Sequence, residues 1–169
     1  MMRNVVQVWK ISLRVLEDTL GQYYGCLSQA EQDRANRFHF PDDRRRFIVA
    51  RGSLRHLLAR QLAQLPSAID FCYGEYGKPA IELGAMTQWP SSQAGELHFN
   101  LSHSGELALC ALSYQGPVGI DIEKVKPISR LEGMMARCLS AGEQKQVQAE
   151  ALADQSRVFC STGLVRRLI

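Results

Sequence analysis

The order of the predicted secondary-structure elements is the feature that most constrains the fold of this chain. A strand pattern near the N-terminus is followed by helical patterns over residues 28–65. Strand patterns then crowd into residues 69–125, and helical patterns return after residue 130. Helices that precede and follow a group of strands, instead of alternating with them, are typical of α+β proteins and not of a doubly wound sheet. We therefore expect an α+β fold.

The clearest single element is an amphipathic helix in the stretch PDDRRRFIVARGSLRHLLARQLAQL, residues 41–65. Asp42 or Asp43 can cap its start, and Pro66 would end it. Its apolar residues recur at helical spacing and predict one buried stripe. That stripe consists of Phe47, Ala50, Leu54, Leu57, Leu58, Leu62 and Leu65.

Two capping boxes predict further helix starts, with Ser28 three residues before Glu31 and Ser140 three residues before Glu143. Period-two patterns predict strands in VVQVWKISL, IDFCY, PAIEL, ELHFNL, ELALCALS and PVGIDIEKV, with turn signals at EYGK, SHSG and YQGP.

Composition bounds the class of protein. A chain of 169 residues fits one domain or two small lobes. The five cysteines form no CxxC pair, so neither a zinc site nor a disulfide framework is indicated, and a reducing cytoplasm is expected. Charged residues interrupt the apolar N-terminal stretch, which excludes a signal peptide or membrane span there. The net charge of +3 permits an acidic partner without requiring one.

The stretch VGIDIEKV carries the first candidate site. In a strand, Asp121 and Glu123 would point to the same face, about 7 Å apart along the chain. Hard carboxylate oxygens of this kind suit Mg²⁺, which proteins hold with one or two carboxylates plus substrate phosphates. The alternative interpretation is an edge strand with its polar face in water.

The second candidate is a series of arginines on the long helix. Arg44, Arg51 and Arg55 are spaced by seven and four residues, so they share one helical stripe. Arginine suits phosphate because its planar guanidinium donates two hydrogen bonds at once. A solvated basic face is the alternative.

Two turns complete the candidate residues. Lys78 in YGKPAI lies at a tight turn before a strand, where a cation can meet a phosphate, although lysines are common at turns. Ser102 and His103 in FNLSHSG can hold a phosphate together with turn amides. As sequence neighbours they do not form a catalytic dyad, and a turn-forming serine beside an exposed histidine is the alternative.

These motifs are far more specific in this order than each is alone. The arginine helix, YGKPAI, HFNLSHSG and VGIDIEKVKPIS resemble the 4′-phosphopantetheinyl transferases, in particular the two-lobed single-chain group, over residues 28–150. The resemblance implies two similar α+β lobes with pseudo-two-fold symmetry, the first over residues 1–113 and an incomplete second over residues 116–169. It also implies transfer of 4′-phosphopantetheine from coenzyme A to a serine of an acyl or peptidyl carrier protein, with 3′,5′-ADP released.

The same resemblance assigns roles to the candidate residues. Asp121 and Glu123 would hold Mg²⁺ on the pyrophosphate. Coenzyme A phosphates would be bound by Arg51 and Arg55, which match the family's R-x-x-L-R pattern as RGSLR, and by Lys78, Ser102 and His103. The protein is expected to be a cytoplasmic monomer that acts on an acidic carrier protein.

The family's last motif, W-[ST]-x-K-E-[AS], is expected after DQSRVF, where this chain reads CSTGLVRRLI. Permitted codons for STGLVRRLI, read from the third base of the first codon, give Tyr-Trp-Thr-Cys-Lys-Glu-Ala-Tyr. We therefore expect that a frameshift truncates the second lobe and impairs activity. A non-catalytic coenzyme A or carrier-binding remnant is the alternative. A nucleic-acid-binding module is disfavoured because the charge is low and Asp121 and Glu123 repel phosphate.

Restoring the shifted reading frame should increase transfer of phosphopantetheine to a carrier protein. The Lys-Glu pair of the restored motif includes a candidate general base, and loss of such a base typically costs about 10²- to 10⁴-fold in rate. The mass of a carrier protein incubated with coenzyme A and Mg²⁺ measures transfer by both chains. Equal rates for the two chains would contradict the expectation.

Overall fold

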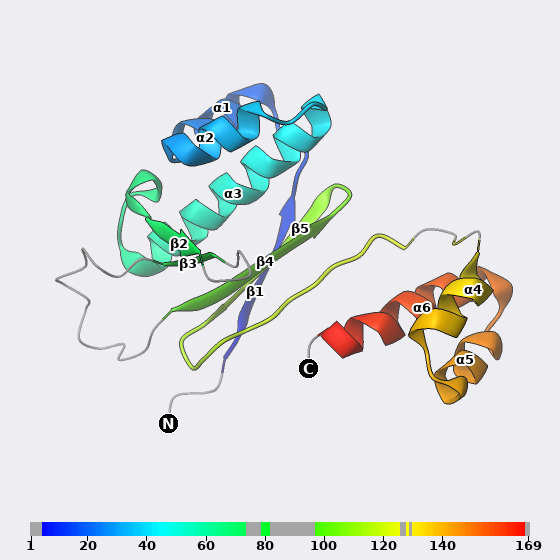
Figure 1. Ribbon diagram of the computed structural model, residues 1–169. Coiled ribbons are helices and arrows are strands. Elements are labelled where there is room, and N and C mark those ends of the chain that lie inside the picture. The colour runs from blue at the N-terminus through cyan, green and yellow to red at the C-terminus, as the bar shows by residue number, and fades with distance from the viewer. Residues whose placement is uncertain (1–4, 74–78, 82–96, 126–127, 129, 168–169) are drawn as a thin grey trace. The chain divides into compact units, whose positions relative to one another are not determined.

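A computed structural model describes residues 5–73, 79–81, 97–125, 128 and 130–167 (Figure 1). The chain divides into two compact units, residues 1–120 and 121–169. Helices and small antiparallel sheets make up the described residues, so the prediction of an α+β fold is confirmed. The predicted lobe boundaries and the symmetry between lobes stay predictions.

A three-stranded antiparallel sheet forms the base of the first unit, in the order β1-β5-β4. Its strands are β1 (Gln7–Ser12), β4 (His98–Ser104) and β5 (Leu107–Ser113). Strands β1 and β5 lie within stretches predicted as strands, whereas β4 continues through Ser104, so the turn predicted at SHSG is wrong for Ser102–Ser104. A two-residue turn joins β4 to β5, and its first residue, Gly105, has φ of 60°. That conformation favours glycine and matches the twist of a hairpin. A second sheet pairs β2 (Phe71–Tyr73) with β3 (Pro79–Ile81).

Helix α3 (Pro41–Leu62) packs along one face of the three-stranded sheet, and two shorter helices pack on α3 (Figure 1). These are α1 (Glu17–Gly25) and α2 (Gln29–Asn36). Leu54 and Leu58 of α3 are fully buried against Phe99, Cys110 and other sheet residues. Burial of apolar surface between helix and sheet is the main stabilising contribution to this layer.

Close packing of α1 on α3 depends on Gly52. A Cβ atom at this position would lie 2.6 Å from the Cβ atom of Tyr23, closer than real contacts allow. Helix α1 was absent from our sequence-based expectations, because its two glycines and the lack of a capping side chain leave no strong local signal. Tertiary packing against α3 therefore stabilises a helix that local preference does not favour.

The ends of α3 differ from the sequence-based prediction. Phe40 is the N-cap and makes no side-chain cap, whereas Pro41 occupies the first helical turn. Asp42 and Asp43 lie in the first turn, where their negative charges interact favourably with the positive end of the helix dipole. The helix ends at Leu62 because Ala63 adopts a left-handed conformation, before a 3₁₀ turn over Pro66–Ala68.

The second unit contains three helices among its described residues, α4 (Leu131–Cys138), α5 (Ala141–Gln148) and α6 (Leu152–Arg167). Met135, Leu139, Val147 and Phe159 form its buried core. The predicted capping box is confirmed at the start of α5, where the N–H of Ser140 donates to a carboxylate oxygen of Glu143 at 2.7 Å.

The predicted strand over residues 117–125 is wrong, since these residues belong to neither sheet. Strand β4 does contact this segment, but through a side chain. The N–H of Ile120 donates to Oδ1 of Asn100 at 3.3 Å, in place of a backbone ladder. Period-two alternation alone does not supply a partner strand, and a strand needs one to satisfy its backbone groups.

An ion cluster joins the β4–β5 turn to the start of α3. Glu106 accepts hydrogen bonds from Arg45 at 3.0 Å and from Arg46 at 2.7 Å, and Arg14 lies 3.5 Å away. Arg45 also donates to the carbonyl of Leu13, at the end of β1. Hydrogen bonds from Arg45 and Arg46 lower the pKa of Glu106 from 4.5 to about 2.

Replacing this carboxylate should destabilise the fold in a pH-dependent way. Because the folded pKa of Glu106 is lowered, its contribution is present above pH 4.5 and is lost as the pH falls towards about 2. Glu106→Gln should reduce the free energy of unfolding by about 1 kcal/mol at neutral pH, since the pairs are partly exposed. Urea unfolding at pH 7 and near pH 2 measures the difference.

Glu17→Gln, which changes an exposed residue in the first turn of α1, is the control and should have little effect. A loss of stability for Glu106→Gln that is the same at pH 7 and near pH 2 would contradict the electrostatic explanation.

Candidate functional site

A pocket of about 490 Å³ opens in the first unit between α2, α3, β2 and β4, and we call it the α2–α3 pocket. Charged and aromatic side chains make up much of its lining. These are Glu31, Arg34, Arg37, Phe47, Arg51, Arg55, Asp70, Phe71 and His103. Four arginines against two carboxylates give the pocket a positive balance, which favours an anionic ligand.

Glu31 links the two helices that form the pocket. Its Oε2 atom accepts the N–H of Ser28 at 2.9 Å, and its own N–H donates to Ser28 Oγ, so the predicted capping box at the start of α2 is confirmed. The same carboxylate accepts hydrogen bonds from Nε of Arg51 and, at 2.7 Å, from Nε of Arg55. One side chain thus caps α2 and holds it to α3.

Arg55 extends this network to the next segment of the chain. Its side chain is 1% exposed, and Nη1 donates to the carbonyls of Pro66 and Ile69 at 2.9 and 2.8 Å. The Phe71 ring lies 5.2 Å from the Arg55 guanidinium and 4.2 Å from that of Arg51. Charge attraction and stacking on an aromatic face therefore fix both guanidinium groups.

The ionisation of Glu31 follows from these contacts. Burial raises its pKa, but the hydrogen bonds from the Ser28 N–H, Arg51 and Arg55 together outweigh burial, so the pKa lies below 4.5. Glu31 is therefore ionised at neutral pH. Its contribution to stability is present above pH 4.5 and is lost as the pH falls through the lowered pKa.

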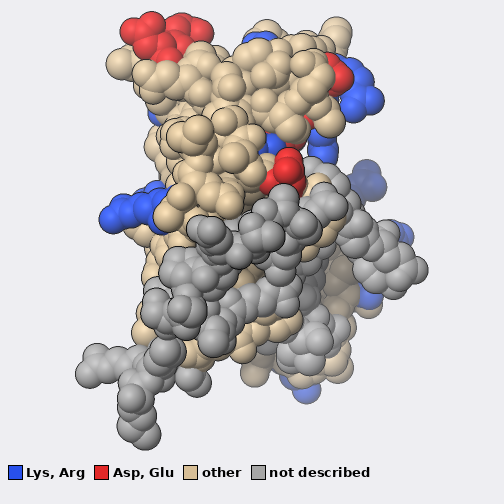
Figure 2. Space-filling model, turned by 90° about the vertical axis from the view of Figure 1, so that its left-hand side faces the viewer, with Lys and Arg blue, Asp and Glu red and all other residues tan. Residues whose placement is uncertain are grey.

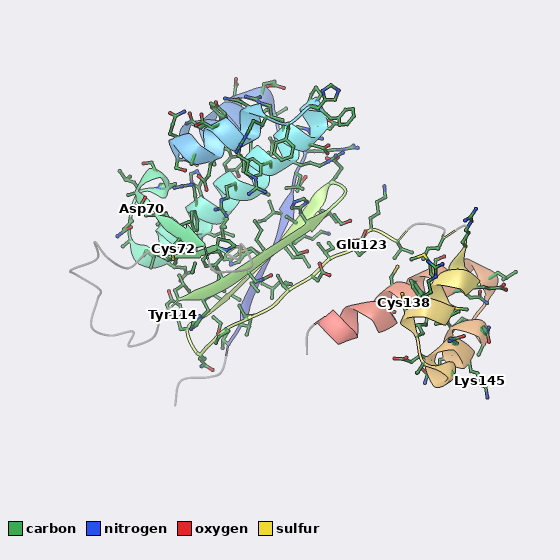
Figure 3. All side chains as sticks on the ribbon, viewed as in Figure 1. Asp70, Cys72, Tyr114, Glu123, Cys138 and Lys145 are labelled. Carbon is green, nitrogen blue, oxygen red and sulfur yellow. The ribbon has the colours of Figure 1, made fainter. Side chains whose placement is uncertain are left out.

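Arg34, Arg37 and His103 supply the exposed polar edge of the pocket. Neither Arg34 nor Arg37 makes an ion pair within the described part of the chain, although the Arg34 guanidinium lies 5.2 Å from the Phe47 ring. Asp70 lies just before β2, on the side of the unit that α2 covers (Figure 3). Figure 2 shows basic and acidic side chains close together near the middle of this side.

Three of the predicted site residues meet in the α2–α3 pocket, namely Arg51, Arg55 and His103. Ser102 neighbours His103 on β4, but strand alternation directs its side chain to the opposite face of the sheet. Lys78 lies outside the described residues. Arg44 does not line this pocket; near the start of α3 it donates to Asn36 and contacts the Tyr24 ring.

Asp121 and Glu123 belong to the start of the second unit. Asp121 is half-buried and its Oδ1 atom accepts the N–H of Ile122 at 2.9 Å, whereas Glu123 is exposed. Two carboxylates two residues apart are a donor set that Mg²⁺ accepts. No cluster of three or more possible metal-ligating side chains occurs within the described ranges.

Sequence reasoning did not identify Arg34 and Arg37 as site residues. Their three-residue spacing on α2 places them near one face, but a short polar helix gives no sign of which face meets a pocket. It also assigned Glu31 only a capping role. The partner of a buried arginine can be seen only after α2 and α3 have packed together.

Comparisons with known proteins identify the family of this chain. The family described as 4′-phosphopantetheinyl transferase, N-terminal, matches residues 13–115, which include all of the residues lining the α2–α3 pocket. The chain belongs to the 4′-phosphopantetheinyl transferase family.

Individual relatives carry the same description. The chain is 37% identical to 4′-phosphopantetheinyl transferase HetI of Nostoc sp. over 94% of this chain and 64% of HetI. It is 33% identical to 4′-phosphopantetheinyl transferase Sfp of Bacillus subtilis over 82% of this chain and 56% of Sfp. The chain thus spans roughly half to two thirds of the length of these relatives.

One solved structure shows a weaker likeness. The crystal structure of holo-[acyl-carrier-protein] synthase (AcpS) from Neisseria meningitidis aligns with a TM-score of 0.44 at 14% identity, over 68% of this chain and all of that one. No helix in the described part of the chain is long and apolar enough to cross a membrane.

Removing the carboxylate of Glu31 should destabilise the first unit strongly. Glu31→Gln leaves two arginines without their charged partner, and breaking a buried ion pair from one side typically costs about 3 kcal/mol or more. Asp33→Asn is the matched control, because Asp33 is exposed on the same helix. Urea unfolding followed by circular dichroism measures both. Equal effects of the two substitutions would contradict a structural role for the Glu31 network.

Proposed function

We propose that this protein transfers 4′-phosphopantetheine from coenzyme A to a serine of an acyl or peptidyl carrier protein, and that 3′,5′-ADP is released. Membership of the transferase family supports this reaction class. The observation that carries the proposal is the α2–α3 pocket, whose arginine-rich lining suits the phosphates of coenzyme A.

Within this pocket we assign the exposed cations to the ligand and the buried ones to the framework. Arg34 and Arg37 are exposed at its edge, so each can turn its guanidinium towards a phosphate. Arg55 already donates Nε and Nη1 within the protein, so it acts by holding Glu31 and the Pro66–Ile69 segment in place. Arg51 is intermediate between the exposed arginines assigned to the ligand and the buried arginine of the framework. Its guanidinium packs on the ring of Phe71.

His103 and the aromatic rings of the pocket complete the proposed coenzyme A site. His103 projects from β4 beside Leu101, where its imidazole can donate a hydrogen bond to a phosphate oxygen. The rings of Phe47 and Phe71 line the same space and offer apolar faces to the adenine base. Lys78 and Ser102 remain proposed phosphate ligands on the basis of the family motifs alone.

Asp121 and Glu123 would hold Mg²⁺ in this proposal. The ion would supply charge neutralisation on the pyrophosphate during phosphoryl transfer. The reaction joins the hydroxyl oxygen of the carrier serine to the β-phosphorus of coenzyme A, and the bond from that phosphorus to the bridging oxygen breaks. The serine proton passes to a base, and 3′,5′-ADP leaves. A cytoplasmic location and a monomeric state complete the proposal.

Loss of the exposed arginines should weaken coenzyme A binding. Arg34→Gln and Arg37→Gln should each raise the dissociation constant by about tenfold, because each removes a charge-assisted hydrogen bond to phosphate. Calorimetric titration of the full chain with coenzyme A in the presence of Mg²⁺ measures the change. Arg44→Gln, which removes an arginine outside the pocket, is the matched control and should bind as the original chain does.

A second ligand makes this test specific for the 3′-phosphate. Coenzyme A without its 3′-phosphate should bind more weakly to the original chain, and the arginine substitutions should then have a smaller effect. If Arg34→Gln and Arg37→Gln both bind coenzyme A like the original chain, the assignment of this pocket is wrong.

A further inference from the structure

A second hollow in the first unit lies between the edge strand β1 and α3, and we call it the β1–α3 groove. It has a volume of about 410 Å³, within the range of small-molecule sites. Trp9 and Lys10 line it from β1, Tyr23 from α1, and Ser53, His56 and Arg60 from α3. None of these residues lines the α2–α3 pocket, so the two hollows are separate.

Two buried polar atoms in this groove have no hydrogen-bond partner within the described part of the chain. They are Oγ of Ser53 and the indole Nε1 of Trp9. Ser53 is only 7% exposed, although it lines the groove. A buried polar atom without a partner is costly, and it calls for an explanation such as a ligand or water that completes its hydrogen bonding.

The charges around these two atoms restrict the chemistry of that ligand. Arg60 lines the groove and makes no ion pair among the described residues, and the described lining contains no acidic side chain. Lys10 borders the groove at the edge of β1, but strand alternation directs its side chain to the sheet face opposite Trp9. The Trp9 N–H can only donate a hydrogen bond, and the Ser53 hydroxyl can also donate. Donors beside an unneutralised arginine favour an acceptor that carries negative charge.

The polar residues that α3 contributes to the groove lie along one face of the helix. Ser53, His56 and Arg60 lie at positions i, i+3 and i+7, so they share one face of the helix. The ring of Tyr23 meets that of His56 edge to face at a centroid distance of 5.6 Å, which fixes one wall of the groove. Trp9 of β1 also lines the groove.

We propose that the β1–α3 groove is a binding site for a small oxyanion ligand, one that carries a phosphate or carboxylate group. The oxyanion accepts hydrogen bonds from Trp9 Nε1 and Ser53 Oγ, and its charge is balanced by Arg60. An apolar ligand would leave both buried atoms without a partner, and a cationic ligand would be repelled. The volume holds a molecule larger than a single phosphate ion, since one water takes about 30 Å³ of liquid.

The test uses the emission of Trp9 in the full chain. The sequence has two tryptophans, so a Trp89→Phe background leaves Trp9 as the one reporter. Potassium phosphate in one series and citrate in another are added at constant ionic strength held with chloride. We expect at least one anion to change the emission saturably, and the more effective anion identifies the phosphate or carboxylate source. A water-filled groove would give no saturable change with either anion, and that result would overturn the proposal.

Substitutions separate specific binding from general screening. Ser53→Ala and Arg60→Gln should each raise the dissociation constant of the more effective anion by about tenfold, which is the effect of losing one hydrogen bond or one charge. Arg44→Gln, on the same helix outside the groove, should leave binding unchanged. Without an anion, Ser53→Ala should unfold at the same urea concentration as its background or at a higher one, because it removes a buried polar atom without a partner. A lower midpoint would show that Oγ has a protein partner, and unchanged anion binding in both groove variants would likewise refute the site.

This outcome is independent of the coenzyme A assignment. Arg34→Gln, which alters the α2–α3 pocket, should leave the response of Trp9 to phosphate or citrate unchanged. If it removes that response, the emission change comes from the α2–α3 pocket and the proposed groove site is refuted.

Discussion

The buried carboxylate of Glu31 is the interaction on which the first unit depends. It caps α2, accepts hydrogen bonds from two arginines of α3, and is itself only 4% exposed. A buried ion pair contributes little net stability compared with an apolar contact, but the loss of one partner is costly. The network therefore fixes the position of α2 on α3 more than it adds to overall stability. Because Arg55 also binds the carbonyls that precede β2, the same network sets the distance between the helices and the small sheet.

Helix α3 separates two hollows of different character. On one side, the α2–α3 pocket combines buried, paired arginines with exposed ones. On the other side, the β1–α3 groove combines Arg60 with buried polar atoms that lack partners among the described residues. The long arginine-rich stretch is thus not a uniform basic face. Arg45 and Arg46 hold the β4–β5 turn, Arg51 and Arg55 hold α2, and Arg60 lines the groove.

The sequence predicted those elements whose signals are local. Capping boxes identified the starts of α2 and α5, and alternation identified β1, β4 and β5. It failed where tertiary contacts decide the structure. Helix α1 can pack on α3 because Gly52 has no side chain to collide with it. The segment around Asp121 lacks the partner strand that its alternation suggested. Of the predicted site residues, Arg51, Arg55 and His103 line one pocket, whereas Arg34 and Arg37 reach that pocket only when α2 docks on α3.

The crystal structure of the full chain with bound coenzyme A tests the central claim most directly. The account predicts that electron density for the 3′-phosphate lies in the α2–α3 pocket, within hydrogen-bonding distance of Arg34 or Arg37, with the salt bridges of Glu31 to Arg51 and Arg55 intact. Density for the nucleotide elsewhere, with this pocket empty, would contradict the account. So would a bound phosphate that displaces Glu31 from both arginines, because the buried network would then be part of the ligand site and not its framework.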